Sequence, residues 1–101
     1  MEDYVFGKKA LVIGMARSGA ALARTLVARG AEVTAYDAKS GEAMDAIVAL
    51  LGDTVHWALG GDAMAEVEKN DLVFISPGVP IGIPALNHAR ELGKPVIGEV
   101  E

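Results

Sequence analysis

Short apolar runs alternate with segments of helical spacing along the whole chain. The runs predict five strands, which cover residues 8–14, 31–37, 54–60, 71–76 and 94–100. Between the strands, apolar residues recur every three or four positions and predict helices over residues 18–29, 42–51, 63–69 and 84–92. The segment 76–84 is rich in proline and glycine, which predicts a loop before the last helix.

The second predicted helix, residues 42–51, is an example of this helical spacing of apolar residues. Its spacing predicts an apolar stripe formed by Ala43, Ile47 and Leu50, and Gly52 is a typical residue for ending such a helix. Pro84 suits the first turn of the last helix, because its missing N–H has no intrahelical partner there.

Strands that are apolar on both faces and alternate with helices predict a parallel sheet with helices on both sides. The predicted fold class is therefore α/β, a Rossmann-like three-layer domain with a five-stranded parallel sheet and right-handed crossovers. Residues 1–101 contain no internal repeat and no interdomain linker, which predicts one domain. The chain stops just after the fifth predicted strand, so we expect a domain cut from a longer protein.

Composition narrows the class of protein. The chain has 101 residues and a net charge of −5, which argues against a nucleic-acid partner. Its charges are scattered, and no apolar run approaches the roughly 20 residues that span a membrane. There are no cysteines, and the N-terminus lacks the apolar core of a signal peptide. We therefore expect a cytoplasmic domain without a membrane partner.

Three polar or glycine-rich loops follow predicted strands. They read GMARSG (14–19), DAKSG (37–41) and SPGVP (76–80). In open α/β sheets, ligands bind beyond the carboxyl ends of the strands, near the switch in strand order. The sequence therefore predicts a ligand site where these three loops converge.

The first loop resembles a dinucleotide fingerprint, G-x-G-x-x-G, but has Ala16 at the middle glycine. Gly14 permits a tight turn, and Gly19 permits close packing of the following helix. The helix start and the Ser18 hydroxyl favour a bound phosphate. The alternative is a tight turn with a serine cap. A methyl group at Ala16 hinders the close approach of backbone to a dinucleotide pyrophosphate.

The other two loops carry further candidates. Asp37 could hold a ribose hydroxyl or a base N–H, or it could serve as a turn or helix-cap aspartate. Lys39 could reach a carbonyl or a phosphate, or face solvent. Ser76, Pro77 and Gly78 could expose backbone N–H groups to a ligand, or form a plain turn.

Several other polar or aromatic residues do not follow a sequence pattern typical of a catalytic or metal site. His56 and His88 lie far apart without a ligand pattern, and Trp57 is assigned to packing. Glu99 and Glu101 are assigned to a solvated strand end. No catalytic triad is apparent, we expect no bound metal, and no P-loop for ATP occurs in the chain.

Taken together, LVIGMARSG, YDAKS, ISPGVP and VIGEVE resemble the first domain of the Mur ligase family, in its D-glutamate-adding (MurD) branch. The likeness covers nearly all 101 residues in order. It implies a cytoplasmic three-domain enzyme of peptidoglycan synthesis that joins D-glutamate to UDP-MurNAc-L-alanine. The family uses ATP and Mg²⁺ and passes through an acyl phosphate. Its first domain holds the UDP end, its central domain binds ATP, and its last domain brings in the amino acid.

The resemblance also implies a set of contacts with the UDP moiety. Ser18 would contact the pyrophosphate, Arg17 would stack against the uracil, and Asp37 would pair with the uracil edge. The remaining contacts would come from the Ala38 backbone, Lys39, and the loop of Ser76, Pro77 and Gly78 over the uridine. The sequence departs from the family at Ala16, Arg17, Ala38 and Lys39, which leaves those individual contacts open.

The resemblance further implies that this chain has no catalytic residues, binds no cofactor and is inactive without the central and C-terminal domains. Two alternatives from other classes remain. One is an NAD(P)-binding domain of an oxidoreductase or of a potassium-channel regulator, and the other is an interaction module without a ligand. A sibling Mur ligase that adds L-alanine is a closer alternative.

Overall fold

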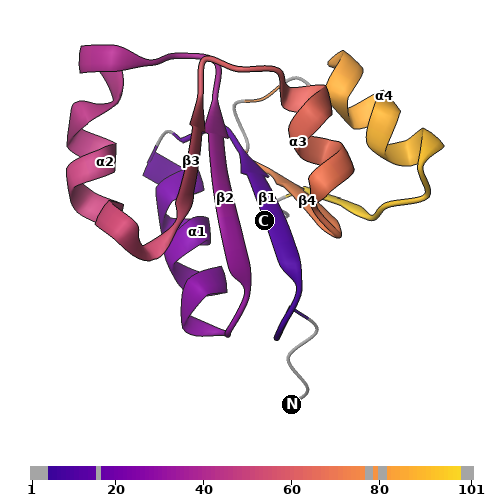
Figure 1. Ribbon diagram of the computed structural model, residues 1–101, viewed down its shortest axis with the longest axis horizontal. Coiled ribbons are helices and arrows are strands. Elements are labelled where there is room, and N and C mark those ends of the chain that lie inside the picture. Colours follow the sequence, from indigo (N-terminus) through magenta and orange to yellow (C-terminus); the bar gives the residue numbers. More distant parts are fainter. Residues whose placement is uncertain (1–4, 16, 77–78, 80–81, 99–101) are drawn as a thin grey trace.

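All the predicted strands pair in one parallel sheet, in the order β3-β2-β1-β4-β5 (Figure 1). The computed structural model describes residues 5–15, 17–76, 79 and 82–98. Its strands are β1 (Lys9–Ile13), β2 (Glu32–Asp37), β3 (His56–Leu59), β4 (Leu72–Ile75) and β5 (Val96–Gly98). Its helices are α1 (Arg17–Ala28), α2 (Asp45–Leu51), α3 (Ala63–Lys69) and α4 (Pro84–Glu91). The predicted α/β fold class is confirmed.

Strand order reverses at β1. The chain runs outward from β1 to β2 and β3, and then crosses to the other side of β1 to form β4 and β5. The loops that follow β1 and β4 therefore diverge to opposite faces of the sheet, which opens a crevice at the carboxyl edge.

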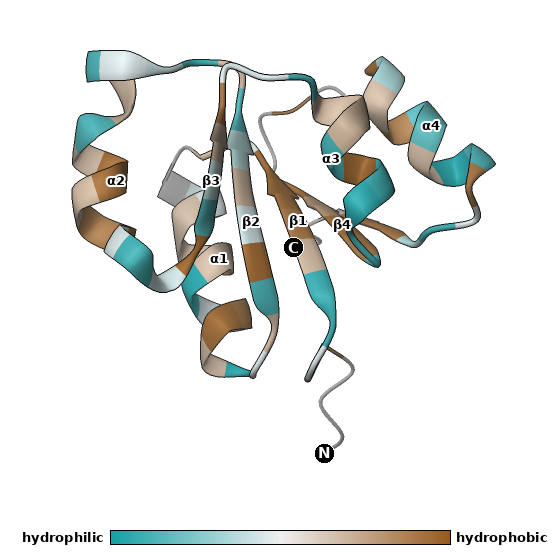
Figure 2. Ribbon diagram, viewed as in Figure 1, coloured by the Kyte–Doolittle hydropathy of each residue, from teal (hydrophilic) through white to brown (hydrophobic). Residues whose placement is uncertain are grey.

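The strands β1 and β4 at the centre of the sheet are buried on both faces, which explains their continuous apolar runs (Figure 2). In β1, Ala10 and Val12 point to the core under α1 and α2, whereas Leu11 and Ile13 point to the core under α3 and α4. Trp57 packs against the first core, and its indole N–H donates to the Gly52 carbonyl at 2.9 Å. The assignment of this residue to packing is confirmed.

The apolar stripe predicted for α2 is wrong at Ala43 and Leu50, whereas Ile47 packs against the core as predicted. Leu50 is 57% exposed and Ala43 is also exposed, whereas Met44 and Leu51 are each 3% exposed. A 3₁₀ turn, Gly41–Met44, precedes α2, and its last residue begins the buried stripe. The sequence also offers this stripe, because four apolar residues follow the i, i+3, i+4, i+7 spacing from Met44. The residues that face the core are Met44, Ile47, Val48 and Leu51.

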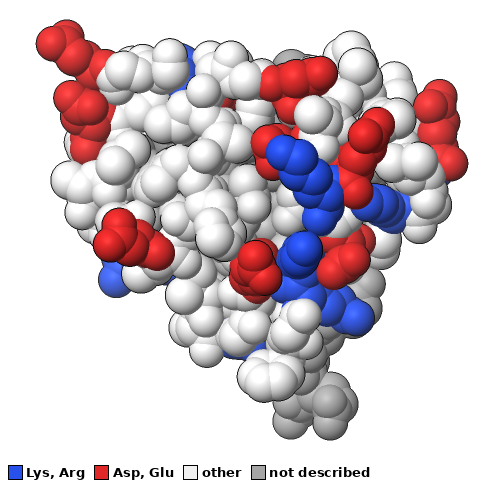
Figure 3. Space-filling model, viewed as in Figure 1, with Lys and Arg blue, Asp and Glu red and all other residues white. Residues whose placement is uncertain are grey.

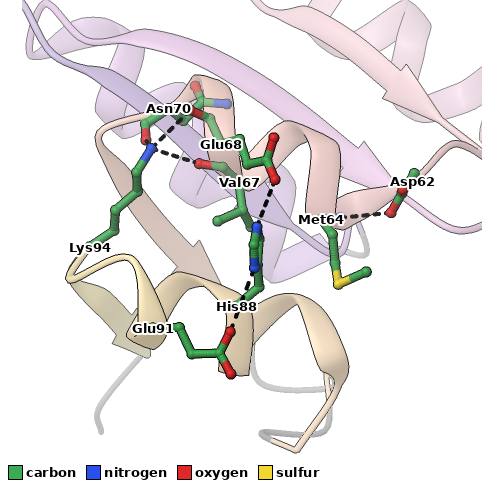
Figure 4. Close-up of polar contacts among 8 residues, drawn as sticks. All are labelled: Asp62, Met64, Val67, Glu68, Asn70, His88, Glu91 and Lys94. Atoms are coloured by element: carbon green, nitrogen blue, oxygen red, sulfur yellow. Dashed lines mark hydrogen bonds and ion pairs between the residues drawn. The ribbon is translucent and has the colours of Figure 1, made fainter.

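The C-terminal end of the short helix α3 is hydrogen-bonded to the side chain of Lys94, which follows α4. The Lys94 ammonium group donates to the carbonyl oxygens of Val67 at 3.0 Å, Glu68 at 3.0 Å and Asn70 at 2.6 Å (Figure 4). These bonds place a positive charge at the negative, C-terminal end of the helix, where the Val67 carbonyl also accepts the N–H of the C-cap residue Asn70 at 3.3 Å. His88 on α4 also contacts Glu68, with Nε2 and Oε2 at 2.8 Å. The two helices that line one side of the crevice are thus joined at their far ends.

Among the described residues, no helix has the length and apolar character needed to cross a bilayer.

Candidate functional site

The predicted loops meet at the carboxyl edge of the sheet. The N–H of Gly14, just after β1, donates to the Tyr36 carbonyl of β2 at 2.8 Å. The N–H of Ser76, just after β4, donates to the Ile13 carbonyl of β1 at 3.1 Å. The sheet ladder therefore continues into the first residue of each loop and fixes where the loops begin.

Asp37 joins the loop after β1 to the loop after β2. Its Oδ2 accepts the N–H of Met15 at 2.7 Å, and its Oδ1 accepts the N–H of Lys39 at 2.9 Å. The turn-aspartate role is therefore present in the structure. Each carboxylate oxygen has two lone pairs, so the half-buried group retains capacity to accept a donor from a ligand.

Two glycines allow these loops to pack without side chains. Gly14 has a φ of +96°, and a Cβ there would overlap the Ser76 hydroxyl and lie 2.7 Å from Cγ2 of Val79. A Cβ on Gly19, in the first turn of α1, would overlap the Gly14 carbonyl oxygen. The start of α1 thus lies directly against the turn that follows β1, with no space for a side chain.

The remaining candidate site residues differ in their solvent exposure. Ser18 is exposed on the first turn of α1, where the backbone N–H groups have no intrahelical partner. Lys39 is exposed as well. Ser76 is only 4% exposed, and its hydroxyl donates to the Ile13 carbonyl at 3.3 Å. Its contact with a ligand stays a prediction.

Some of the predicted contacts fall outside what the structure describes. Ala16, Pro77 and Gly78 lie outside the described residues, as do Glu99 and Glu101. Arg17 begins α1, but its side chain is outside the description too. Ala38 is exposed at the end of β2.

A cleft of about 550 Å³ opens at this edge, on the side of the sheet covered by α3 and α4. Its lining is mostly apolar and includes the carboxylates of Asp37 and Asp62. Three of the predicted site residues line it, namely Gly14, Asp37 and Ala38. The other lining residues are Ile13, Tyr36, Gly61, Asp62, Ala63, Met64, Val79, Ile83, Pro84 and Ala85.

The sequence analysis missed the contribution of the turn between β3 and α3. Because β3 is parallel to β1 and β2, the turn at residues 60–62 opens at the same edge as the predicted loops. The motif GGD at 60–62 indicates this turn in the sequence, since glycines followed by an aspartate are typical of a turn into a helix. The Asp62 carboxylate caps α3 by accepting the N–H of Met64 at 2.9 Å (Figure 4).

Tyr36 lies at the base of the cleft. Its hydroxyl donates to the Gly61 carbonyl at 2.8 Å. Burial, and then the negative charges of Asp37 and Asp62, raise the pKa of Tyr36 above its usual value of 10.0. The phenol therefore keeps its proton at neutral pH and remains a hydrogen-bond donor.

A doubly wound parallel sheet with a cleft at its carboxyl edge, beside the switch in strand order, is the architecture of Rossmann-like nucleotide-binding domains. Comparison with known proteins places the sequence more narrowly. The chain belongs to the family described as Mur ligase MurD-like, N-terminal domain, whose model matches residues 8–98.

One relative is the UDP-N-acetylmuramoylalanine--D-glutamate ligase of Acidobacterium capsulatum, which is 44% identical over 96 residues. The match covers 94% of this chain but 21% of the relative. The chain therefore spans about a fifth of the length of the curated relatives it matches.

Solved structures with a similar fold include two ligases and a dehydrogenase. A pseudomurein peptide ligase type C from Methanothermus fervidus superposes with a TM-score of 0.72 and 26% identity, over 91% of this chain and 19% of its own. The ligase MPL from Neisseria meningitides, which joins UDP-N-acetylmuramate to L-alanyl-γ-D-glutamyl-meso-diaminopimelate, gives 0.68 and 28%, over 90% and 28%. A UDP-glucose dehydrogenase from Pyrobaculum islandicum gives 0.64 and 25%, over 95% and 26%.

The packing of Gly19 can be tested by adding one methyl group. Helix propensity alone favours Gly19→Ala by up to about 1 kcal/mol. Because the new Cβ overlaps the Gly14 carbonyl, we expect a net loss of about 1–3 kcal/mol in the free energy of unfolding, measured in urea.

Gly82→Ala is the matched control. A Cβ at Gly82 meets no atom within 4 Å, so we expect a change within about 0.5 kcal/mol. Equal stability of the two variants would contradict the tight contact between α1 and the turn after β1.

Proposed function

We propose that this chain binds the UDP end of UDP-MurNAc-L-alanine within a cytoplasmic, ATP-dependent ligase that adds D-glutamate during peptidoglycan synthesis. The family match over residues 8–98 carries this proposal, because it covers every loop of the candidate site that the structure describes. The name of the relative from Acidobacterium capsulatum supports D-glutamate over L-alanine as the added amino acid.

In this proposal the phosphates lie at the start of α1. The N–H groups of the first helical turn, which have no partner within the helix, and the positive end of the helix dipole favour a diphosphate. The exposed Ser18 hydroxyl adds a donor, and Lys39 can supply a positive charge from the neighbouring loop. Gly14 and Gly19 allow the start of α1 to pack directly against the turn that follows β1, which places this helix end at the edge of the sheet.

The uracil lies in the cleft. The carboxylate of Asp37 accepts an N–H of the base, and the backbone of Ala38 lies beside it. Contacts from Arg17, Ser76, Pro77 and Gly78 remain predictions of the family resemblance. The apolar lining of the cleft suits the faces of a flat ring and would not solvate a phosphate.

The other steps of the reaction belong to the rest of the ligase. We propose that a central domain binds ATP and Mg²⁺, that a C-terminal domain brings in the amino acid, and that both lie outside residues 1–101. This chain then binds no cofactor or metal and forms no amide bond alone. On the face shown in Figure 3, Lys and Arg residues are interspersed with Asp and Glu, which does not suit a nucleic-acid partner.

An NAD(P)-binding domain is the second candidate, and the match with UDP-glucose dehydrogenase favours it at the level of fold. The sequence argues against this candidate at Ala16, because dinucleotide-binding folds have glycine at this position of the motif to admit the pyrophosphate.

The two candidates predict different ligands. We expect UDP to shift the backbone amide signals of Gly14, Ser18 and Ala38 in NMR spectra of the chain, because these residues surround the proposed site. NADH at the same concentration should leave them unchanged. Shifts with NADH and none with UDP would overturn the proposal.

The contribution of Asp37 can be tested by affinity. We expect Asp37→Ala to weaken UDP binding by about 1–3 kcal/mol, because a half-buried acceptor for the base is lost. The affinity should be measured by calorimetry under conditions in which circular dichroism shows that the variant is folded. This control is needed because the N–H groups of Met15 and Lys39 also lose their acceptor.

Asp53→Ala is the control for overall charge. Asp53 is exposed and lies in the turn after α2, away from the cleft residues, so we expect unchanged affinity. Equal affinity of the wild type and Asp37→Ala would remove Asp37 from the binding site.

A further inference from the structure

The turn between β3 and α3 is held to the rest of the site by two hydrogen bonds. The N–H of Gly60 donates to the Asp37 carbonyl at 2.8 Å, and the Tyr36 hydroxyl donates to the Gly61 carbonyl at 2.8 Å. The first bond continues the ladder between β2 and β3. The second is a side-chain bond across 25 positions of sequence, and it fixes the turn from below.

This turn forms one wall of the cleft. Gly61, Asp62 and Met64 line it on one side, and Ile83 and Pro84 line it on the side of α4. β3 is an edge strand of four residues and α3 has seven, so the turn joins two short elements. The bond from Tyr36 ties the middle of this turn, at Gly61, to a strand that lines the cleft.

The chemistry of the cleft selects the part of a nucleotide that enters it. Asp37 and Asp62 place two carboxylates beside an otherwise apolar lining, which repels phosphate and accepts N–H donors. The nucleotide base is uncharged, flat and carries N–H groups. The base therefore fits between these walls, whereas the phosphates fit at the start of α1.

We propose that Tyr36 is a positioning residue for the base: its hydroxyl holds the 60–62 turn as a wall against the ring, so the turn determines how tightly the uracil of a uridine nucleotide binds. This inference rests on the proposed function and assigns a wall of the site to a segment that the family resemblance did not indicate. Met64, which is partly exposed, supplies the apolar contact from that wall.

The test separates base binding from phosphate binding. UDP and inorganic pyrophosphate are titrated into the wild-type chain, Tyr36→Phe and Thr34→Val. Tyr36→Phe removes the hydroxyl and keeps the ring, and we expect it to weaken UDP binding about three- to tenfold. Its affinity for pyrophosphate should match the wild type.

Thr34→Val removes a hydroxyl from the same strand, at a position that does not line the cleft. We expect it to bind both ligands as the wild type does. Met64→Ala leaves Tyr36 in place and removes the contact from the wall, so it should also weaken UDP without affecting pyrophosphate.

The outcomes are distinguishable. A UDP-to-pyrophosphate affinity ratio in Tyr36→Phe equal to that of the wild type would overturn the role of Tyr36, even if the variant is less stable, because lost stability alone does not change this ratio in folded protein. Unchanged UDP binding by Met64→Ala would remove the turn from the site. A wild-type chain that binds pyrophosphate but not UDP would instead overturn the proposed function.

Discussion

The carboxylate of Asp37 holds the candidate site together. It accepts one N–H from the loop after β1 and one from the loop after β2, so two segments that are 22 residues apart share a single anchor. A carboxylate suits this task because it can accept several N–H donors at once, and charge-assisted bonds are stronger than neutral ones. The backbone of the same residue accepts the N–H of Gly60, which brings in the turn before α3. Three of the loops at the sheet edge are thus positioned by one residue.

The two ends of a nucleotide bound as proposed would meet different physical conditions at this edge. At the start of α1, the first helical turn presents N–H groups that have no intrahelical partner, which favours anions. In the cleft, the lining is apolar and two carboxylates lie close by, which disfavours anions and favours a neutral ring. In the proposed complex, this difference in charge would orient the ligand. The sheet itself does not decide the ligand, because binding sites are built on the loops of a fold that is shared with dehydrogenases.

Much of the fold could be predicted because local signals and tertiary packing agree. The buried strands are continuous apolar runs, and Gly52 and Pro84 mark helix ends where the structure has them. The predicted phase of α2 was wrong although the sequence carries the correct one, because Met44, Ile47, Val48 and Leu51 have the i, i+3, i+4, i+7 spacing of a core-facing helix stripe. The convergence of the loops after β1, β2 and β4 followed from the topology. The wall supplied by the β3–α3 turn could have been expected from the same topology and from the GGD motif at 60–62, but its bond from Tyr36 to Gly61 is visible only in the folded chain. The two roles considered for Asp37 could not be separated by sequence, and the structure shows the turn role directly.

The most direct test of the account is where the uracil ring lies when UDP is bound. Intermolecular nuclear Overhauser effects between the uracil protons and the chain measure this without any mutation. The account predicts contacts from the uracil to the ring of Tyr36 and to the side chains of Met64 and Ile83, which line the cleft on the face covered by α3 and α4. Contacts from the uracil to Ala20 or Ile47, on the face covered by α1 and α2, would contradict it.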